Sequence, residues 1–177
     1  MRNRIILCTV MMLFASVLMQ PAWGEKHNNR RKTTKAIATN HSDNLTDSSA
    51  VSRILNDAFA HLGSRYRRGG KGPDAFDCSG FTSYVFGLSD YSIGASSRDQ
   101  YAKHTPVGRN ELRRGDLVFF TSSRSGRNVG HVGIVVDVDS VTNNFTFIHA
   151  STSKGVRVDS STDGYYGSRY VGARRVF

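Results

Sequence analysis

The stretch DAFDCSGFTSYVFGLS, residues 74–89, joins a glycine-rich loop to the helix around which the domain is expected to form. Its apolar side chains recur every three or four positions, at Cys78, Phe81, Val85 and Leu88. This is the spacing of one helix face. Asp77 or Ser79 can cap the start of the helix through a side-chain oxygen. The pattern therefore predicts a helix over 78–89 with Cys78 in its first turn.

A second helix is predicted upstream, over 51–63. The apolar residues of this segment also have helical spacing: Val51, Ile54, Leu55, Ala58, Phe59 and Leu62. Ser48 and Ser49 precede them as candidate caps, and Gly63 follows them as a stop signal. The two helices lie next to each other in the sequence, before any extended segment.

After residue 112 the pattern changes from helical spacing to short β-rich runs separated by turn residues. The runs are LVFF at 117–120, HVGIVVDV at 131–138, NNFTFIHAS at 143–151, GVRVDS at 155–160 and RYVGARRVF at 169–177. Strands that follow helices, instead of alternating with them, favour an α+β domain with an antiparallel sheet. We therefore predict N-terminal helices packed on such a sheet.

Residues 1–24 have the layout of a cleaved signal peptide. MRNR precedes the apolar run IILCTVMMLFASVLMQ, and a small-x-small site follows at Ala22, Trp23 and Gly24. An uncleaved membrane anchor is the alternative, but Thr9 and Ser16 interrupt the run, and it is short for a span of about 20 residues. We therefore expect an exported protein, periplasmic or secreted, with no membrane span after cleavage.

The remaining chain divides into a polar, basic segment at 25–50 and a domain at 51–177. The segment carries few large apolar groups and is predicted to be a flexible tether. The rest has the length of one domain and no internal repeat. We expect it to be a monomer.

The charge of the chain favours anionic partners. Of the 24 Lys and Arg, Arg2 and Arg4 lie in the signal peptide, which leaves 22 against 14 Asp and Glu, a net charge of +8. Nucleic acid is the usual candidate partner for a basic cytoplasmic protein. Export points instead to cell-wall polymers, anionic lipids or an acidic substrate, so no nucleic-acid partner is expected.

Cys78 is the one cysteine left once Cys8 departs with the signal peptide, which excludes an internal disulfide. A lone thiol in an exported protein is a reactive group, an intermolecular disulfide partner or a small buried hydrophobe. The dipole and free N–H groups at a helix start favour the thiolate. We therefore expect the pKa of Cys78 to be lowered, which favours a reactive role.

Two of the six histidines stand in apolar strands, and these are the candidate partners of the thiol. His131 opens HVGIVV and His149 ends FTFIH. Polar rings in such strands are costly unless they are paired. Neighbouring strands can place them side by side near Cys78 as base and orienting group. The alternatives are core histidines or a metal site; no metal is expected, because close pairs such as CxxC or HExxH are absent from the sequence.

Five separated motifs carry a resemblance to a known family. They are, in order, RYRRGGKGPDAFDCSGF, SSRDQ, LRRGDLVFF, VGHVGIVV and FIHASTSKGVRV, and they cover nearly all of 51–177. The chain resembles the NlpC-type (NlpC and p-sixty) family of bacterial cell-wall cysteine peptidases, and is most similar to its single-domain, Spr-like murein endopeptidases. The resemblance implies a papain-like fold.

The resemblance also implies a reaction. Cys78 is implied to be the nucleophile, His131 the general base and acid, and His149 the group that orients the ring of His131. The implied activity is hydrolysis of D-glutamyl-diaminopimelate or diaminopimelate-D-alanine bonds in peptidoglycan stem peptides or crosslinks, through a thioester and without a cofactor. Two rival functions stay open: a non-catalytic wall-binding protein, and a lipid acyl transferase on a related fold.

Further residues are implied to contact substrate. Tyr66 is implied to assist near the oxyanion, and Asp77 and Ser79 to line the substrate cleft. Ser97 is implied to line it too, although its motif GASSRDQ has Ala95 where the family usually has proline. Four basic residues of the loop before the cysteine are hypothesised to meet substrate carboxylates: Arg65, Arg67, Arg68 and Lys71.

Overall fold

The computed structural model describes residues 47–177. The predicted signal peptide and residues 25–46 of the predicted tether lie outside the described residues. None of the helices within 47–177 is long and apolar enough to cross a membrane.

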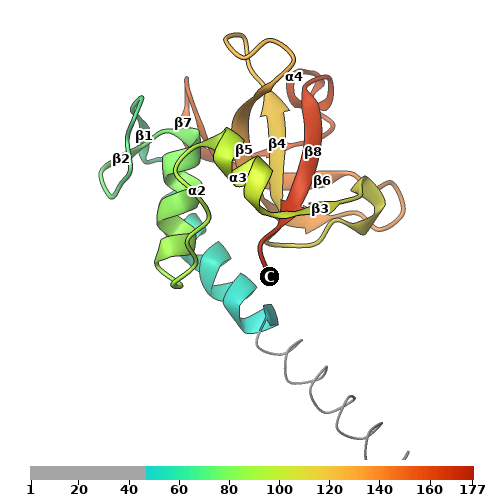
Figure 1. The fold of residues 1–177 in the computed structure, drawn as a ribbon, viewed down its shortest axis with the longest axis horizontal. Helices are drawn as coiled ribbons and strands as arrows, with labels where there is room; N and C mark the ends of the chain where they lie inside the picture. The colour runs from blue at the N-terminus through green and yellow to red at the C-terminus, as the bar shows by residue number, and fades with distance from the viewer. Residues whose placement is uncertain (1–46) are drawn as a thin grey trace, which may run out of the picture. The chain divides into compact units, whose positions relative to one another are not determined.

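A six-stranded sheet forms most of the domain (Figure 1). Its strands are β3 (Thr105–Val107), β4 (Leu117–Thr121), β5 (Val129–Val138), β6 (Phe145–Ser151), β7 (Gly155–Ser160) and β8 (Tyr170–Arg175). The order across the sheet is β3-β8-β4-β5-β6-β7, and each neighbouring pair is antiparallel. The predicted α+β class with an antiparallel sheet is therefore confirmed.

The helices that precede the sheet in the sequence lie against one side of it (Figure 1). Helix α2 (Cys78–Gly87) packs on β5 and β6, and α3 (Ser97–Lys103) packs on β5. Two short parallel strands, β1 (Arg65–Tyr66) and β2 (Ala75–Phe76), frame the glycine-rich loop before α2. The remaining elements are a 3-10 turn, η1 (Arg109–Glu111), and the four-residue helix α4 (Gly164–Gly167). The packing of α2 on β5 and β6 is what brings the cysteine and histidine segments together.

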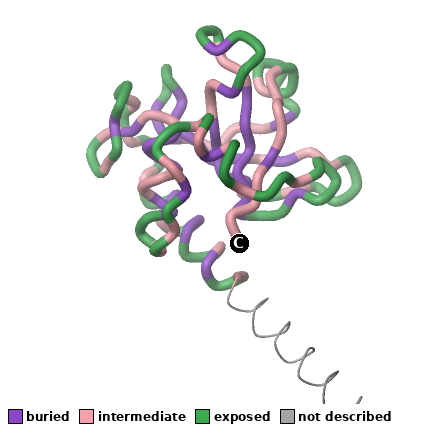
Figure 2. Tube along the Cα trace, viewed as in Figure 1, coloured by how far each residue is buried: buried purple, intermediate pink, exposed green. Residues whose placement is uncertain are grey.

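Both faces of the central strands are buried, as the purple segments of Figure 2 show. In β4, Leu117 and Phe119 join a cluster that includes Phe81 of α2, whereas Val118 and Phe120 join a second cluster on the other face. A strand buried on both sides gains from apolar residues at every position. This accounts for the continuous LVFF run, which lacks the alternation of a half-exposed strand.

The first helix differs from its prediction at the N-terminal end. Residues 47–60 are helical, so Ser48 and Ser49 lie inside the helix and do not cap it. Ala50, in the last position of the predicted tether, is fully buried. Residues 47–49 are polar, so the apolar spacing that predicted the helix does not extend into this turn.

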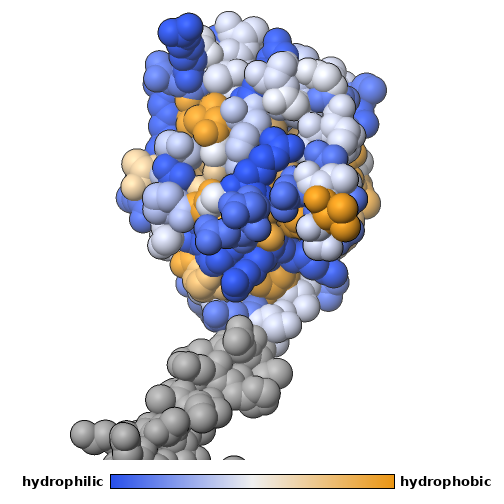
Figure 3. Space-filling view, turned by 90° about the vertical axis from the view of Figure 1, so that its right-hand side faces the viewer, coloured by the Kyte–Doolittle hydropathy of each residue, from blue (hydrophilic) through white to orange (hydrophobic). Residues whose placement is uncertain are grey.

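The exposed large hydrophobic residues are scattered: Phe59, Leu62, Leu88, Val141 and Tyr165. Phe59, Leu62 and Leu88 were predicted on apolar helix faces, and each lies in the last turn of a helix or just after it. The face drawn in Figure 3 is mostly hydrophilic, with hydrophobic residues in separate spots. The buried part of each helix face is thus shorter than the sequence pattern.

Candidate active site

A cavity of about 480 Å³ joins the segments that carry the predicted site residues. Its walls include Tyr66, Cys78, Ser97, His131 and Tyr166, from five different elements. We call it the Cys78 cavity. His149 lies behind His131, fully buried, and is not part of the wall.

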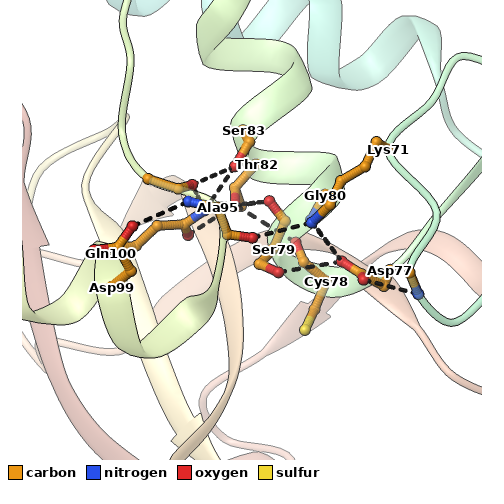
Figure 4. Close-up of polar contacts among 12 residues, drawn as sticks. Lys71, Asp77, Cys78, Ser79, Gly80, Thr82, Ser83, Ala95, Asp99 and Gln100 are labelled. Carbon is orange, nitrogen blue, oxygen red and sulfur yellow. Dashed lines mark hydrogen bonds and ion pairs between the residues drawn. The ribbon is translucent and has the colours of Figure 1, made fainter.

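Cys78 is the first residue of α2, as predicted, and Asp77 is the N-cap. One carboxylate oxygen of Asp77 accepts hydrogen bonds from the Gly80 N–H at 2.6 Å and the Ser79 hydroxyl at 3.2 Å; the other accepts from the Gly69 N–H at 3.0 Å (Figure 4). In this view the Cys78 sulfur points away from that network. Asp77 and Ser79 therefore hold the helix start and the preceding loop together, and neither lines the cavity.

The thiol has a raised pKa, contrary to the expectation from its place at a helix start. Burial and the negative charge of Asp77 raise the pKa of Cys78 above its ordinary value. Hydrogen bonds from the backbone N–H groups of Ser79, Val132 and Cys78 itself act in the opposite direction and do not outweigh them. The thiol is therefore protonated at rest and needs a base. The hydrogen bond from the Val132 N–H places the sulfur next to the backbone of the residue that follows His131.

The two predicted histidines lie side by side on β5 and β6. His131 Nε2 and His149 Nδ1 are 2.8 Å apart, and the rings meet edge to face. Burial lowers the pKa of each ring to about 3. The charge of His149 contributes to the lowering at His131, and the charge of Arg157 contributes to the lowering at His149. Both rings are thus neutral at rest, and His131 can accept a proton, as a general base must.

The chain of contacts continues beyond the predicted residues. His149 Nε2 and Asp159 Oδ2 are 2.9 Å apart, and Arg157 pairs with the other oxygen of that carboxylate. Sequence reasoning missed both residues of β7. Their signal was the alternation in GVRVDS, which places Arg157 and Asp159 on one face of a strand.

Tyr66 and Ser97 lie at the cavity wall, as the predictions require. Burial raises the pKa of the Tyr66 hydroxyl, and the charges of Cys78 and Asp77 raise it further, so this hydroxyl remains a donor near the thiol. Ser97 opens α3. The helix is fastened to α2 by the buried Gln100, whose amide nitrogen donates to the Ser79 carbonyl and the Ser83 hydroxyl (Figure 4).

The basic residues at the cavity are not those predicted. Arg65, Arg67 and Arg68 are exposed and outside the cavity wall, and Lys71 donates to the Ala95 carbonyl at 3.0 Å. Arg98 and Arg124 line the cavity instead. Arg98 is fixed to β5 through a bond to the Val129 carbonyl at 3.2 Å, whereas Arg124 lies in the loop between β4 and β5. Within 47–177, no group of three or more His, Cys, Asp or Glu is arranged to hold a metal ion.

Comparison with known proteins identifies the family. Residues 63–175 match the NlpC/P60 family. The chain belongs to this family. Its fold is the papain-like cysteine peptidase fold of NlpC/P60 domains.

Individual relatives agree with this assignment. The chain is 41% identical over 123 residues, 70% of its length, to the probable endopeptidase p60 of Listeria seeligeri. It is 40% identical over 129 residues, 71% of its length, to the murein DD-endopeptidase MepS/murein LD-carboxypeptidase of Escherichia coli. It covers only 22% and 62% of those two proteins, respectively. A crystal structure of an NLP/P60 family protein from Staphylococcus aureus superposes with a TM-score of 0.64 at 30% identity, over 73% of this chain and 42% of that one.

Proposed function

We propose that the protein is a cysteine endopeptidase that hydrolyses peptide bonds in peptidoglycan stem peptides or crosslinks. The observation that carries the proposal is the shared cavity of Cys78 and His131, with the ring of His131 hydrogen-bonded to His149. A thiol, a neutral ring and a group that orients the ring are the parts needed for nucleophilic catalysis.

The proposed reaction starts from the neutral pair. His131 Nδ1 takes the proton from the Cys78 thiol, and the thiolate attacks a substrate carbonyl carbon. In this proposal the backbone N–H of Cys78, at the helix start, and the Tyr66 hydroxyl stabilise the oxyanion. The His131 imidazolium then protonates the leaving amine, and a thioester remains on Cys78. Water, deprotonated by the same ring, hydrolyses the thioester and restores the thiol.

The substrate class is supported by the relatives and by the charge of the cavity. The E. coli relative is named a murein DD-endopeptidase, and we take this name to refer to diaminopimelate-D-alanine crosslinks. We therefore propose these crosslinks as the main substrate, ahead of the D-glutamyl-diaminopimelate bond. Stem peptides carry free carboxylates, for which Arg98 and Arg124 at the cavity wall are suitable partners. Export to the periplasm or medium would bring the protein to this substrate.

Digestion of purified peptidoglycan tests the proposal. Wild type and Cys78→Ala are incubated with isolated sacculi, and the muropeptides are separated and identified by mass. We expect crosslinked dimers to be converted to monomers by wild type only. Unchanged muropeptides with wild type would favour a wall-binding protein or an acyl transferase, and equal digestion by both proteins would exclude Cys78 as the nucleophile.

A further inference from the structure

The register of β6 and β7 places a charged pair next to the buried histidine. His149 is directly opposite Arg157, and Phe147 is directly opposite Asp159. Directly opposed residues of an antiparallel pair share a face, and so do alternate residues of one strand. His149, Arg157 and Asp159 therefore project from the same face, with Asp159 in the diagonal position that a long side chain can reach.

Every oxygen of the Asp159 carboxylate has a partner in this arrangement. Oδ2 lies 2.9 Å from His149 Nε2, and Oδ1 lies 2.5 Å from Arg157 Nη2. The His149 side chain is 0% exposed, that of Asp159 10% and that of Arg157 35%. Burial raises the pKa of Asp159 and the bound guanidinium of Arg157 acts in the opposite direction, so the carboxylate is ionised at neutral pH. An ionised carboxylate only accepts hydrogen bonds, so the ring proton of His149 must be on Nε2.

The proton position on His149 determines the proton position on His131. A neutral imidazole has one N–H and one bare nitrogen. With its proton on Nε2, His149 has a bare Nδ1, which can only accept from His131 Nε2, 2.8 Å away. The proton of His131 is then on Nε2 as well. Its Nδ1 is bare, and this is the nitrogen that a thiol proton would require.

We propose that Asp159, held by Arg157, is a positioning residue that sets the proton positions of both histidines and so makes His131 Nδ1 the proton acceptor for Cys78. The inference rests on the proposed function for its catalytic meaning. In the step concerned, the S–H bond of Cys78 breaks and an N–H bond forms at His131 Nδ1. The resulting imidazolium keeps its Nε2–H bond to His149, and the charge of Asp159 favours it, since that charge raises the pKa of His131.

Asp159→Asn is the informative substitution, because Arg157 decides which way the new amide turns. The guanidinium only donates hydrogen bonds, so it attracts the amide oxygen and leaves the amide N–H₂ facing His149. His149 must then accept at Nε2 and carry its proton on Nδ1. His131 must then accept a hydrogen bond at Nε2 and carry its own proton on Nδ1. Its Nδ1 can no longer take the proton of the Cys78 thiol. Adding Arg157→Leu frees the amide to turn its oxygen toward His149 and restore the original proton positions.

Other ionisable groups near the two rings have to be considered in any pH-dependent measurement. Tyr166 of α4 packs against both rings, with centroids 6.1 Å from His131 and 5.2 Å from His149. Burial raises the pKa of Tyr166 well above its ordinary value, so its hydroxyl stays neutral. Asp163 and Lys154 act on Asp159 through their charges only. Asp163→Asn is therefore the matched control, since it removes the same charge nearby and an asparagine can still cap α4.

Three measurements on the full chain test the inference. Imidazole ¹⁵N chemical shifts report which ring nitrogen carries each proton. The rate of Cys78 alkylation by iodoacetamide against pH reports the thiol and base without any substrate. The kcat and KM on muropeptides report catalysis.

In wild type and Asp163→Asn we expect both histidines to carry the proton on Nε2. In Asp159→Asn we expect both protons on Nδ1, slower alkylation at neutral pH, and kcat reduced about 100-fold with KM changed less than about twofold. The added Arg157→Leu should recover about tenfold of the loss. A His149 proton on Nδ1 in wild type, or an Asp159→Asn variant with wild-type shifts and alkylation, would overturn the inference. If wild type digests no peptidoglycan while the shifts and alkylation change as expected, the proposed substrate fails and the inference stands.

Discussion

Acidification from pH 7 to pH 5 should destabilise the domain through the paired rings of His131 and His149. The pKa of each ring is lowered to about 3, mainly by burial, from an ordinary value of 6.5. At pH 5 an unfolded chain binds protons at these positions and the folded domain does not. The stabilising contribution of the two neutral rings is therefore present above their ordinary pKa of 6.5. It is lost as the pH falls toward their pKa in the folded domain, about 3.

The magnitude follows from the number of protons withheld. One ring with a folded pKa of about 3 loses about 2 kcal/mol of unfolding free energy between pH 7 and pH 5. Both rings withhold a proton in the folded domain, so the pair together loses about 4 kcal/mol. The figure is an upper bound, since His131 borders the Cys78 cavity. It is still a large part of a typical total of about 5–15 kcal/mol.

Urea unfolding at the two pH values measures the effect. The variant is His131→Gln with His149→Gln, and the control is His104→Gln, which keeps the pair. Wild type and control should lose up to about 4 kcal/mol more than the double variant on acidification. An NMR titration of the wild-type rings provides a second measurement if the double variant does not fold. Equal losses in all three proteins, or rings that titrate near their ordinary pKa in the folded domain, would refute the reasoning.

Three further predictions concern the helix start, the pH profile and the cavity charge. A Cβ at Gly80 would lie 1.9 Å from the Gly70 carbonyl oxygen, so Gly80→Ala should lower the unfolding free energy by about 1–3 kcal/mol in urea, whereas Gly87→Ala, with open space around it, should not. The active pair is the neutral thiol of Cys78, with a raised pKa, and the neutral ring of His131, with a pKa of about 3. The value of kcat/KM on muropeptides should therefore be constant between about pH 5 and 8. A decrease on the acid side with a midpoint near pH 6.5 would contradict this. Arg124→Gln should raise KM on the same substrates about tenfold with kcat little changed, because one carboxylate contact is lost, while Arg114→Gln outside the cavity should leave both constants as they are.

Much of the fold was predictable because its signals are local. The run from Leu117 to Phe120 and the segment after Asn143 are strands on composition alone, and the structure confirms both. The short elements were missed, namely β1, β2, β3, α3 and α4. Two to seven residues carry too little periodicity to be recognised, and tertiary contacts such as those of Gln100 hold them in place.

The predicted site residues have separate outcomes. Cys78, His131, Tyr66 and Ser97 meet at one cavity, with His149 behind His131. Asp77 and Ser79 instead cap and brace α2. Neighbours of a cysteine in sequence need not be its neighbours at a cavity, because successive residues of a helix point in different directions.

The sequence by itself determined which residues can do chemistry and in what kind of element each sits: a thiol at a helix start, and two histidines in apolar strands. These properties depend on neighbours within a few positions. The tertiary structure decided the rest. Burial and Asp77 reverse the expected direction of the pKa shift at Cys78. The packing of separate loops places Arg98 and Arg124 at the cavity wall. The register of β6 and β7 joins Asp159 to His149, because it depends on which residues of two strands face each other and not on the composition of either.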